Sequence, residues 1–183
     1  MKQAQDIPPK VMELMHRYGE KRKLKTLETL VHVGEHCNSI FFVLKGGFLK
    51  KFYNEKSEVR RTISFHLPTH RPFITIAESY FQQKPSYYEI KAFRNSEILV
   101  FKKSLSKKVL EEYDFIESFH YKKIVEVLIY ESELKSRLIT YNSAEFYEHL
   151  CENYPEIIQQ VPSKYIAEFM RISPGWLSKL KAK

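Results

Sequence analysis

The chain has 183 residues, 43% of them hydrophobic and 14% aromatic, which is enough to bury the core of one large domain or two small ones. Thirty Lys and Arg against 22 Asp and Glu give a formal charge of +8 and a pI near 9.3. This charge suits polyanionic partners such as nucleic acid or an anionic membrane surface, and equally a soluble protein with excess lysine. The only two cysteines, Cys37 and Cys151, argue against a disulfide framework and exclude a Cys₄ zinc site or a cysteine-ligated iron–sulfur cluster within one chain.

The N-terminal region reads as a helix followed by basic surface. Pro8-Pro9 opens an apolar-periodic run that predicts a helix over residues 8–25. The basic residues from Arg17 to Lys25 are expected to be a solvated surface of this segment. The apolar positions along one face are Val11, Leu14, Met15 and Tyr18.

Several classes of protein are disfavoured by what the sequence lacks. No segment approaches the ~20 apolar residues of a membrane helix, and residues 1–6 have no signal-peptide core, so we expect a cytoplasmic chain without membrane contact. His32 and His36 lie on an apparent strand and its following turn, and we expect no metal site there. Without a nucleophile–base pair, Gly-rich phosphate loop or carboxylate constellation, the chain is predicted to be no enzyme and to need no cofactor.

Residues 27–102 show a hydrophobic period of two, the period of half-buried strands. Turn signals such as Gly46-Gly47 and Pro68 separate the alternating runs. Many short strands at this spacing predict an antiparallel sandwich or roll. The runs are 27–33, 40–44, 88–92, 98–101 and segments around Phe48, Phe52, Val59, Ile63 and Phe65.

After Lys103 the period returns to 3.6, which predicts a short helix over 104–113 and a long one over 114–139. The long helix carries more apolar surface than a helix lying on a sheet needs. Two interpretations stay open: a buried core helix, or a helix that pairs with its copy in a homodimer. Its apolar residues are Phe115, Phe119, Ile124, Val125, Val127, Leu128, Ile129, Leu134 and Leu138.

A further helix begins near residue 142. Asn142 and Glu145 have the spacing of a capping box, and Pro155 is expected to end or kink the helix. Residues 143–160 carry four Glu and no Lys or Arg, whereas residues 161–183 carry five basic residues against one acid. This switch predicts a basic binding face at the C-terminal end of the sequence.

Residues 161–183 contain two short helices, each with its own start signal. Pro162-Ser163 opens the first, and Ser173-Pro174 places an N-cap before a proline at the first position of the second. Two short helices joined by a tight turn are a helix-turn-helix, whose second helix enters the DNA major groove. The residues predicted to face inward are Tyr165, Ile166, Phe169, Met170, Leu177 and Leu180, and those predicted to face outward are Gly175, Trp176, Ser178, Lys179 and Lys181.

A β-roll, a long helix and a C-terminal helix-turn-helix, in that order, resemble the Crp/Fnr family of bacterial transcription regulators over nearly the whole chain. Residues 33–46, VGEHCNSIFFVLKG, look like the family's glycine-bounded stretch in the roll. The C-terminal segments VPSKYIA, ISP and LSK are similar to a compact subgroup common in Bacteroidetes-type genomes.

The resemblance implies an α+β fold in three parts and no enzymatic activity. The first, 1–113, would be an antiparallel β-roll like a cyclic-nucleotide-binding domain, with flanking helices. The second, 114–140, would be a dimerisation helix, and the third, 141–183, a helix-turn-helix DNA-binding domain without a following wing. The expected partners are double-stranded DNA and a second copy of the chain.

The resemblance also implies an effector pocket in the roll. Members that bind cyclic AMP carry Gly-Glu before a short helix and Arg-Ser at the cyclic phosphate. Here Ser86 stands at the serine, but Pro85 replaces the arginine and the Gly-Glu pair is absent, so binding of cyclic AMP is not expected. A pocket for a small-molecule effector of unknown identity is an alternative to plain packing and strand pairing, and its candidate residues are Thr75, Glu78, Ser79, Ser86 and Tyr87.

In the helix-turn-helix, Lys179 is the predicted base contact, with two recognition helices about one DNA turn apart on a pseudo-palindrome. Ser173 and Ser178 would reach phosphate or base edges, and Gly175 and Trp176 belong to the same predicted contact surface. The residues predicted to position the DNA backbone are Lys164, Lys181 and Lys183.

Three departures from the family pattern motivate an alternative function, and one of them is that no wing is expected after the second helix. Arg171 stands where family turns usually hold a glycine. Either a left-handed arginine costs about 1 kcal/mol there, or the chain follows a different turn. Gly175-Trp176 replaces the polar pair that often follows the Ser-Pro start. The alternative is a ligand- or protein-binding module that has lost sequence-specific recognition and binds random DNA weakly, with a steep salt dependence.

Overall fold

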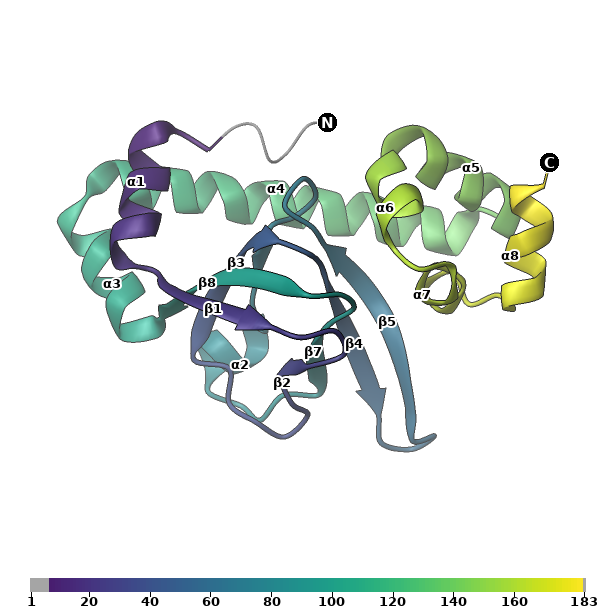
Figure 1. Ribbon diagram of the computed structural model, residues 1–183, viewed down its shortest axis with the longest axis horizontal. Coiled ribbons are helices and arrows are strands. Elements are labelled where there is room, and N and C mark those ends of the chain that lie inside the picture. Colours follow the sequence, from purple (N-terminus) through teal and green to yellow (C-terminus); the bar gives the residue numbers. More distant parts are fainter. Residues whose placement is uncertain (1–6, 183) are drawn as a thin grey trace.

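Two antiparallel four-stranded sheets form a roll at the centre of the molecule, as the alternating sequence predicts (Figure 1). The computed structural model describes residues 7–182. The strands are β1 (Glu20–Leu24), β2 (Thr29–Val31), β3 (Ser39–Lys45), β4 (Phe48–Asn54), β5 (Val59–His66), β6 (Phe73–Ile74), β7 (Tyr88–Ala92) and β8 (Ser96–Lys102). One sheet has the order β1-β8-β3-β6 and the other the order β2-β7-β4-β5, so β5 is an edge strand.

The interior of the roll is filled by apolar side chains from both sheets. Phe48, Ile90 and Ile98 are fully buried there, because alternate residues of a strand point to the same face. Gly46, between β3 and β4, has a φ of +89°, and a side chain on it would collide with Ser96. Glycine is therefore required where these two strands meet.

The helix predicted over residues 8–25 is wrong in its second half. The helix α1 (Pro9–Tyr18) ends before Gly19, whose backbone is extended, and residues 20–24 then form β1, paired antiparallel with β8. Only Leu24 of β1 is buried, so its exposed basic residues resemble a solvated helix surface when the sequence is read alone. Charged side chains are common on edge strands because they discourage pairing with another chain.

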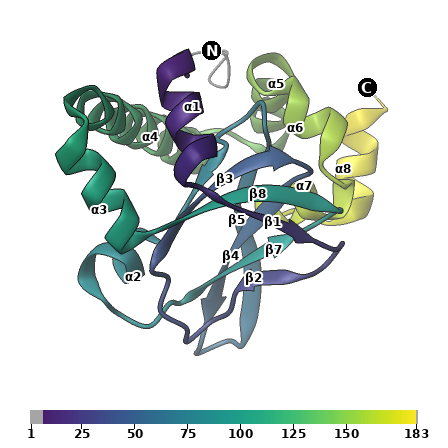
Figure 2. The same cartoon turned by 60° about the vertical axis from the view of Figure 1, so that its left-hand side comes forward.

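Helices lie along one side of the roll and at both of its ends (Figures 1 and 2). The short and long helices after the roll agree with the prediction to within a residue, whereas α2 was not predicted. They are α2 (Ala77–Gln82), α3 (Lys103–Glu112), α4 (Asp114–Thr140), α5 (Ser143–Asn153), α6 (Pro155–Gln160), α7 (Ser163–Phe169) and α8 (Pro174–Lys181).

The long helix α4 leaves most of its apolar surface uncovered. Of its side chains only Tyr130 and Leu134 are buried. Tyr121, Ile124 and Leu128, spaced three and four residues apart on one face, are 70%, 40% and 64% exposed. Of the two interpretations left open by the sequence, a buried core helix is therefore wrong for α4 in the single chain.

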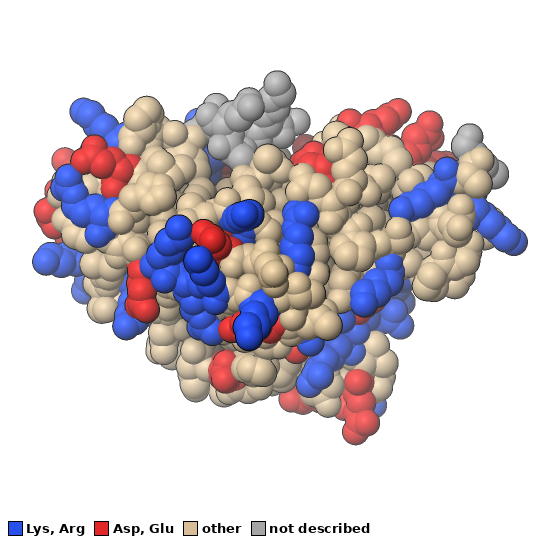
Figure 3. Space-filling view, in the orientation of Figure 1, with Lys and Arg blue, Asp and Glu red and all other residues tan. Residues whose placement is uncertain are grey.

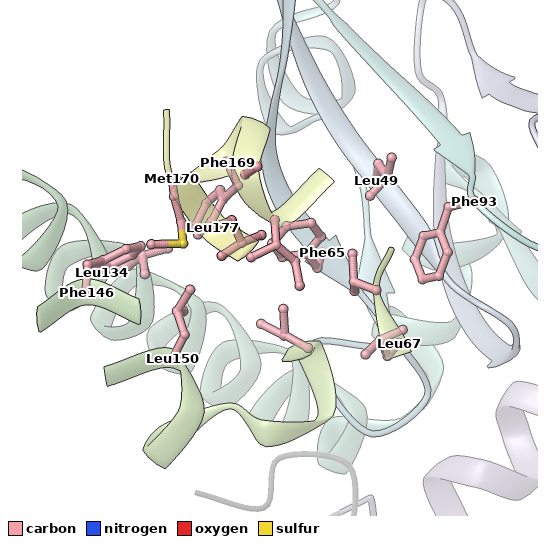
Figure 4. Packing of buried hydrophobic residues seen from close by; sticks show 14 of the residues in the cluster. Leu49, Phe65, Leu67, Phe93, Leu134, Phe146, Leu150, Phe169, Met170 and Leu177 are labelled. Carbon is pink, nitrogen blue, oxygen red and sulfur yellow. The ribbon is translucent and has the colours of Figure 1, made fainter. Parts of the chain in front are cut away.

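The four C-terminal helices share a core with the roll (Figure 4). The predicted capping box at Asn142 and Glu145 is present, and Pro155 separates α5 from α6 as expected. Leu49, Phe65, Leu67 and Phe93 of the roll belong to the same buried cluster as Leu134, Phe146, Leu150, Phe169, Met170 and Leu177 of the helices. Breaks between helices at Tyr113 and Tyr141 coincide with the predicted limits of the three parts, whose standing as domains stays a prediction.

Candidate nucleic-acid interface

The helix pair α7–α8 has the local signals that the sequence predicts. Ser173 caps α8, its Oγ accepting a hydrogen bond of 3.1 Å from the backbone N–H of Trp176, and Pro174 occupies the first helical position. Arg171 in the turn has a φ of +58°, the left-handed backbone expected there. The turn therefore has the left-handed backbone that glycine favours, although the residue there is an arginine.

Burial divides the pair into an inner and an outer face. Leu177 and Leu180 of α8 pack inward onto Ile166, Phe169 and Met170, as predicted. The side of α8 away from the core is polar and basic. The residues exposed on it are Gly175, Trp176, Ser178, Lys179 and Lys181.

Two of these outward side chains are held by neighbouring helices. The Trp176 indole Nε1–H donates to Ser143 Oγ at the start of α5, over 2.9 Å. The Lys181 ammonium donates to Ser163 Oγ at the start of α7, over 2.6 Å. Both contacts fix the edges of the outward face and leave its centre, at Gly175 and Lys179, free of side-chain hydrogen bonds within residues 7–182.

The other predicted backbone-positioning residues lie near this face. Lys164 is exposed at the start of α7, with its Nζ 4.8 Å from the centre of the Tyr165 ring. Ser173 is exposed, and its hydroxyl is occupied by the cap. Lys183 lies outside the described residues.

The sequence does not predict the contacts that fix α7 to the roll. Glu168 accepts two hydrogen bonds from Thr62 of β5, from the backbone N–H (3.0 Å) and from Oγ1 (3.1 Å). Its carboxylate also lies 3.1 Å from the Lys51 ammonium on β4, and the Phe169 and Phe65 rings stack edge-on beside it. The strand thus sets the position of α7, and α7 in turn sets that of α8.

The five predicted effector residues do not meet around one cavity. The Ser79 hydroxyl accepts from the Cys37 backbone N–H, Thr75 Oγ1 donates to the Ser39 carbonyl, and Ser86 Oγ bonds both the N–H and the C=O of Tyr88. These three side chains therefore hold the loop and the strands together.

The remaining two, Glu78 and Tyr87, are exposed. Tyr88 donates to the Glu78 carboxylate over 3.3 Å, while Tyr87 lines an open depression of about 250 Å³ together with Ser86. Thr75, Glu78 and Ser79 do not line it. Beneath α4, a second hollow lined by Arg71 and Tyr130 holds only about 40 Å³, far below the ~300 Å³ of a typical small-molecule site.

A group of polar side chains near that hollow has no signal in the sequence. Arg71 is nearly buried, forms a 2.6 Å ion pair with Glu131 of α4 and lies 4.4 Å from the Tyr130 ring, while its Nε and Nη1 have no partner among the described residues. Burial lowers the pKa of Lys50, whose ammonium lies 4.4 Å from the Tyr88 ring. These residues are far apart in the sequence, and they come together only because β4 pairs with β5 and α4 packs beside the loop that follows β5.

His66 is a buried ionisable group of this region, with 3% of its surface exposed. Its Nδ1–H donates to the Arg71 carbonyl over 2.8 Å, so Nε2 is the acceptor for Ser64 Oγ at 3.0 Å. Burial, and secondly the charge of Arg71, hold the pKa of His66 well below its usual value. The histidine is therefore neutral at pH 7 and joins β5 to the loop that carries Arg71.

Within residues 7–182, no three His, Cys, Asp or Glu side chains gather as a metal site would need. None of the helices in this range has the length and hydrophobicity to cross a bilayer.

No protein-family model matches the sequence, and no curated protein matches it. Among solved structures, FixK2 from Bradyrhizobium japonicum is similar with a TM-score of 0.73 and 11% identity, over 90% of this chain and 83% of that one. A CooA mutant from Carboxydothermus hydrogenoformans gives 0.69 and 12%, over 93% and 77% of the two chains. The c-di-GMP responsive global regulator CLP from Xanthomonas campestris gives 0.68 and 10%, over 93% and 88%.

These three solved structures are Crp/Fnr-family regulators, whereas the Bacteroidetes-type subgroup stays a prediction. An antiparallel roll, a long helix and a C-terminal helix pair, arranged as in those proteins, give this chain a Crp/Fnr-like fold.

Proposed function

We propose that the chain is a DNA-binding transcription regulator of the Crp/Fnr type. The observation that carries the proposal is the α7–α8 pair, in which a capped second helix buries Leu177 and Leu180 and presents a polar, basic face outward. The fold supports the same conclusion, because the similar solved structures include regulators of transcription.

In the proposed complex, α8 lies in the major groove of double-stranded DNA. Lys179, at the centre of the outward face, contacts a base edge, and Ser178 beside it reaches a base or a phosphate. Gly175 leaves open space toward the groove, since no atom lies within 4 Å of where a Cβ would stand. Lys164 and Lys181 contact phosphates and fix the register.

The proposal includes a homodimer formed through α4. Tyr121, Ile124 and Leu128 repeat at the three- and four-residue spacing of a coiled-coil seam, and all three are exposed in the single chain. Covering them with a second copy removes apolar surface from water and gives two recognition helices related by two-fold symmetry. Leu128→Glu should therefore give a monomer by light scattering, whereas Phe81→Glu, at an exposed phenylalanine of α2, should leave the dimer intact.

We further propose that DNA binding does not depend on cyclic AMP or cyclic GMP. Ser79, Ser86 and Thr75 engage their hydroxyls in internal hydrogen bonds, and Pro85 stands where members that bind cyclic AMP have the arginine for the cyclic phosphate. A thermal-shift titration with both nucleotides should show no stabilisation at micromolar concentration. A clear rise in melting temperature would overturn this part of the proposal.

Selection of bound fragments from genomic DNA, followed by mobility-shift titration on the recovered sequence, tests the function. Lys179→Ala should weaken binding to that sequence by about 1–3 kcal/mol, because the shortened side chain no longer reaches a base edge. Lys108→Ala removes an exposed lysine from α3, at the far end of the molecule, and should leave affinity unchanged. Equal affinities of Lys179→Ala and the wild type would contradict the role assigned to Lys179.

The alternative, a binding module that has lost sequence-specific recognition, is tested by the same selection. It predicts that no sequence is enriched and that random duplexes bind weakly, with affinity falling steeply as salt is added. Enrichment of a pseudo-palindromic sequence would exclude it.

A further inference from the structure

We infer that the DNA-binding surface continues from α7 and α8 onto the β4–β5 hairpin of the roll, where Arg60 contacts the phosphate backbone outside the bases read by α8. The inference rests on the proposed function and adds to it a part of the roll that the helix-turn-helix does not contain. We call the surface formed by Lys181, Lys164, Lys51 and Arg60 the basic strip.

The basic strip is continuous from the recognition helix to the roll. Lys181 of α8 donates to Ser163 at the start of α7, next to Lys164. The Lys164 ammonium lies 4.8 Å from the centre of the Tyr165 ring, and the Lys51 ammonium of β4 lies 5.8 Å from the centre of the same ring. Side chains from α8, α7 and β4 therefore follow one another without a gap.

Strand register places Arg60 at the end of this series. In the β4–β5 pair, Lys51 is opposite Thr62 and Tyr53 is opposite Arg60. Because side chains alternate along a strand, these four residues share one face of the hairpin. Thr62 and Lys51 bind Glu168 of α7, so this face is the one that meets the helix pair, and the Arg60 guanidinium lies 5.4 Å from the Tyr53 ring on it.

Arg61 belongs to the opposite face. It is paired with Phe52, whose ring packs 5.3 Å from that of Tyr88 on the side away from α7. Arg60 and Arg61 are both exposed and carry the same charge on neighbouring residues. The chain thus provides its own control for the inference.

The charge of the strip is largely uncompensated. Lys51 is paired with Glu168, but no carboxylate of residues 7–182 lies within ion-pair distance of Arg60, Lys164 or Lys181. Figure 3 shows Lys and Arg gathered over the lower part of the hairpin and over the C-terminal helices, with acidic side chains at the hairpin tip. Glu55 and Glu58, at that tip, end the strip.

Duplex DNA is the occupant that this arrangement favours. In a helix-turn-helix the first helix crosses the DNA backbone, which places Lys164 at a phosphate. Arg60 lies farther from α8 than Lys164 does, on the roll side of α7, and so faces phosphates beyond the edge of the half-site. An exposed guanidinium on an edge strand, without a carboxylate partner among the described residues, suits a phosphate through paired N–H donors.

The test compares two duplexes that contain the selected operator, one ending at its edges and one extended by about ten base pairs on each side, roughly one helical turn. Affinities of the wild type, Arg60→Ala and Arg61→Ala are measured by mobility shift over a range of salt concentrations. The wild type should bind the extended duplex more tightly. Arg60→Ala should weaken binding about 3- to 10-fold on the extended duplex only, and the slope of log affinity against log salt should shrink by about 0.9 for each phosphate that is no longer neutralised. Arg61→Ala should match the wild type on both.

Equal losses of affinity for Arg60→Ala and Arg61→Ala, or no dependence on duplex length, would overturn the inference and leave the proposed function intact. Binding of the wild type to neither duplex would overturn both. A competition experiment tests an acidic protein as the partner instead. If poly-glutamate abolishes the affinity difference between the wild type and Arg60→Ala, and random duplex of equal charge does not, the basic strip binds an acidic protein and the DNA contact is rejected.

Discussion

The two helices of the C-terminal pair are similar in length and adjacent in sequence, yet they are held in opposite ways. The helix α7 is fixed on the roll by a carboxylate that binds Thr62 and Lys51 and by an aromatic stack, Phe169 on Phe65. The helix α8 is buried only through Leu177 and Leu180, and its other side chains face outward. The difference separates two tasks: α7 sets position, and α8 is free to vary its surface.

The largest loss of stability should come from removing the aromatic contact that fixes α7 on the roll. Phe169 is 6% exposed and stacks on both Phe65 and Phe146, so Phe169→Ala should lower the free energy of unfolding by about 3–5 kcal/mol. Trp176→Ala removes a larger ring from α8, but that ring is 44% exposed, and the expected decrease is below about 1 kcal/mol. Urea titrations of the two variants measure both values, and similar decreases would show that the two helices are held alike.

Removal of the polar part of the contact should have a smaller effect. Glu168→Gln abolishes the ion pair with Lys51 and leaves one acceptor fewer for Thr62, which should lower the free energy of unfolding by about 1–3 kcal/mol. Glu148→Gln, at an exposed glutamate of α5, should stay within about 0.5 kcal/mol of the wild type. Calorimetric unfolding of the two variants measures both changes. Equal stabilities would show that Glu168 contributes no more to folding than an exposed glutamate.

Acid should lower the stability of the roll, on which α7 is fixed, through His66 of β5. Its pKa in the folded chain lies well below the usual value near 6.5, so below about pH 6.5 the unfolded chain binds a proton that the folded chain excludes. The contribution of His66 to the free energy of unfolding is complete above that pH and is lost as the pH falls. The slope of this loss approaches about 1.4 kcal/mol per pH unit for this one histidine. Burial lowers the pKa of His70 as well, which adds to the slope in the same direction.

Urea unfolding between pH 7.5 and 5.5 measures this slope. His66→Gln should make the slope shallower and leave the part due to His70, whereas His32→Gln, at an exposed histidine, should leave the slope unchanged. A profile of the wild type that does not fall over this range would contradict a neutral, buried His66.

The smallest effect should be a gain in stability, at the turn that joins the two helices. Arg171→Gly relieves a left-handed backbone and should raise the free energy of unfolding by up to about 1 kcal/mol. Arg171→Ala removes the same side chain but keeps the Cβ, so it should show no such gain. Equal stability of the two variants would place the cost in the arginine side chain, away from the backbone.

Local sequence signals predicted much of the fold. The capping box at Asn142 and the N-cap at Ser173 each depend on residues within four positions, and both are present. The left-handed backbone at Arg171 was expected only from the family resemblance, and it is present as well. The helix predicted across residues 20–24 was wrong because that strand has a single buried residue, and only its pairing with β8, far along the chain, makes it a strand.

The candidate sites were harder to predict for the same reason. Glu168 and Thr62 are 106 residues apart, and the sequence shows Glu168 only as an isolated acid in a basic segment. Ser79 was a candidate for effector binding, yet its hydroxyl binds the backbone of Cys37, 42 residues earlier. Whether a polar side chain is free or already occupied depends on strand pairing, which spacing along the chain does not reveal.

Trp176 is the only tryptophan in the sequence, and it lies on the outward face of α8 with its indole N–H bound to Ser143. All tryptophan emission therefore comes from α8, the helix proposed to enter the groove. A half-exposed indole that becomes covered by a DNA groove should change in emission wavelength and intensity, so an unlabelled sample reports groove entry at α8 alone. Phosphate contacts made elsewhere, including those of Arg60, would be silent in that signal, which separates recognition of the bases from general attraction to the backbone.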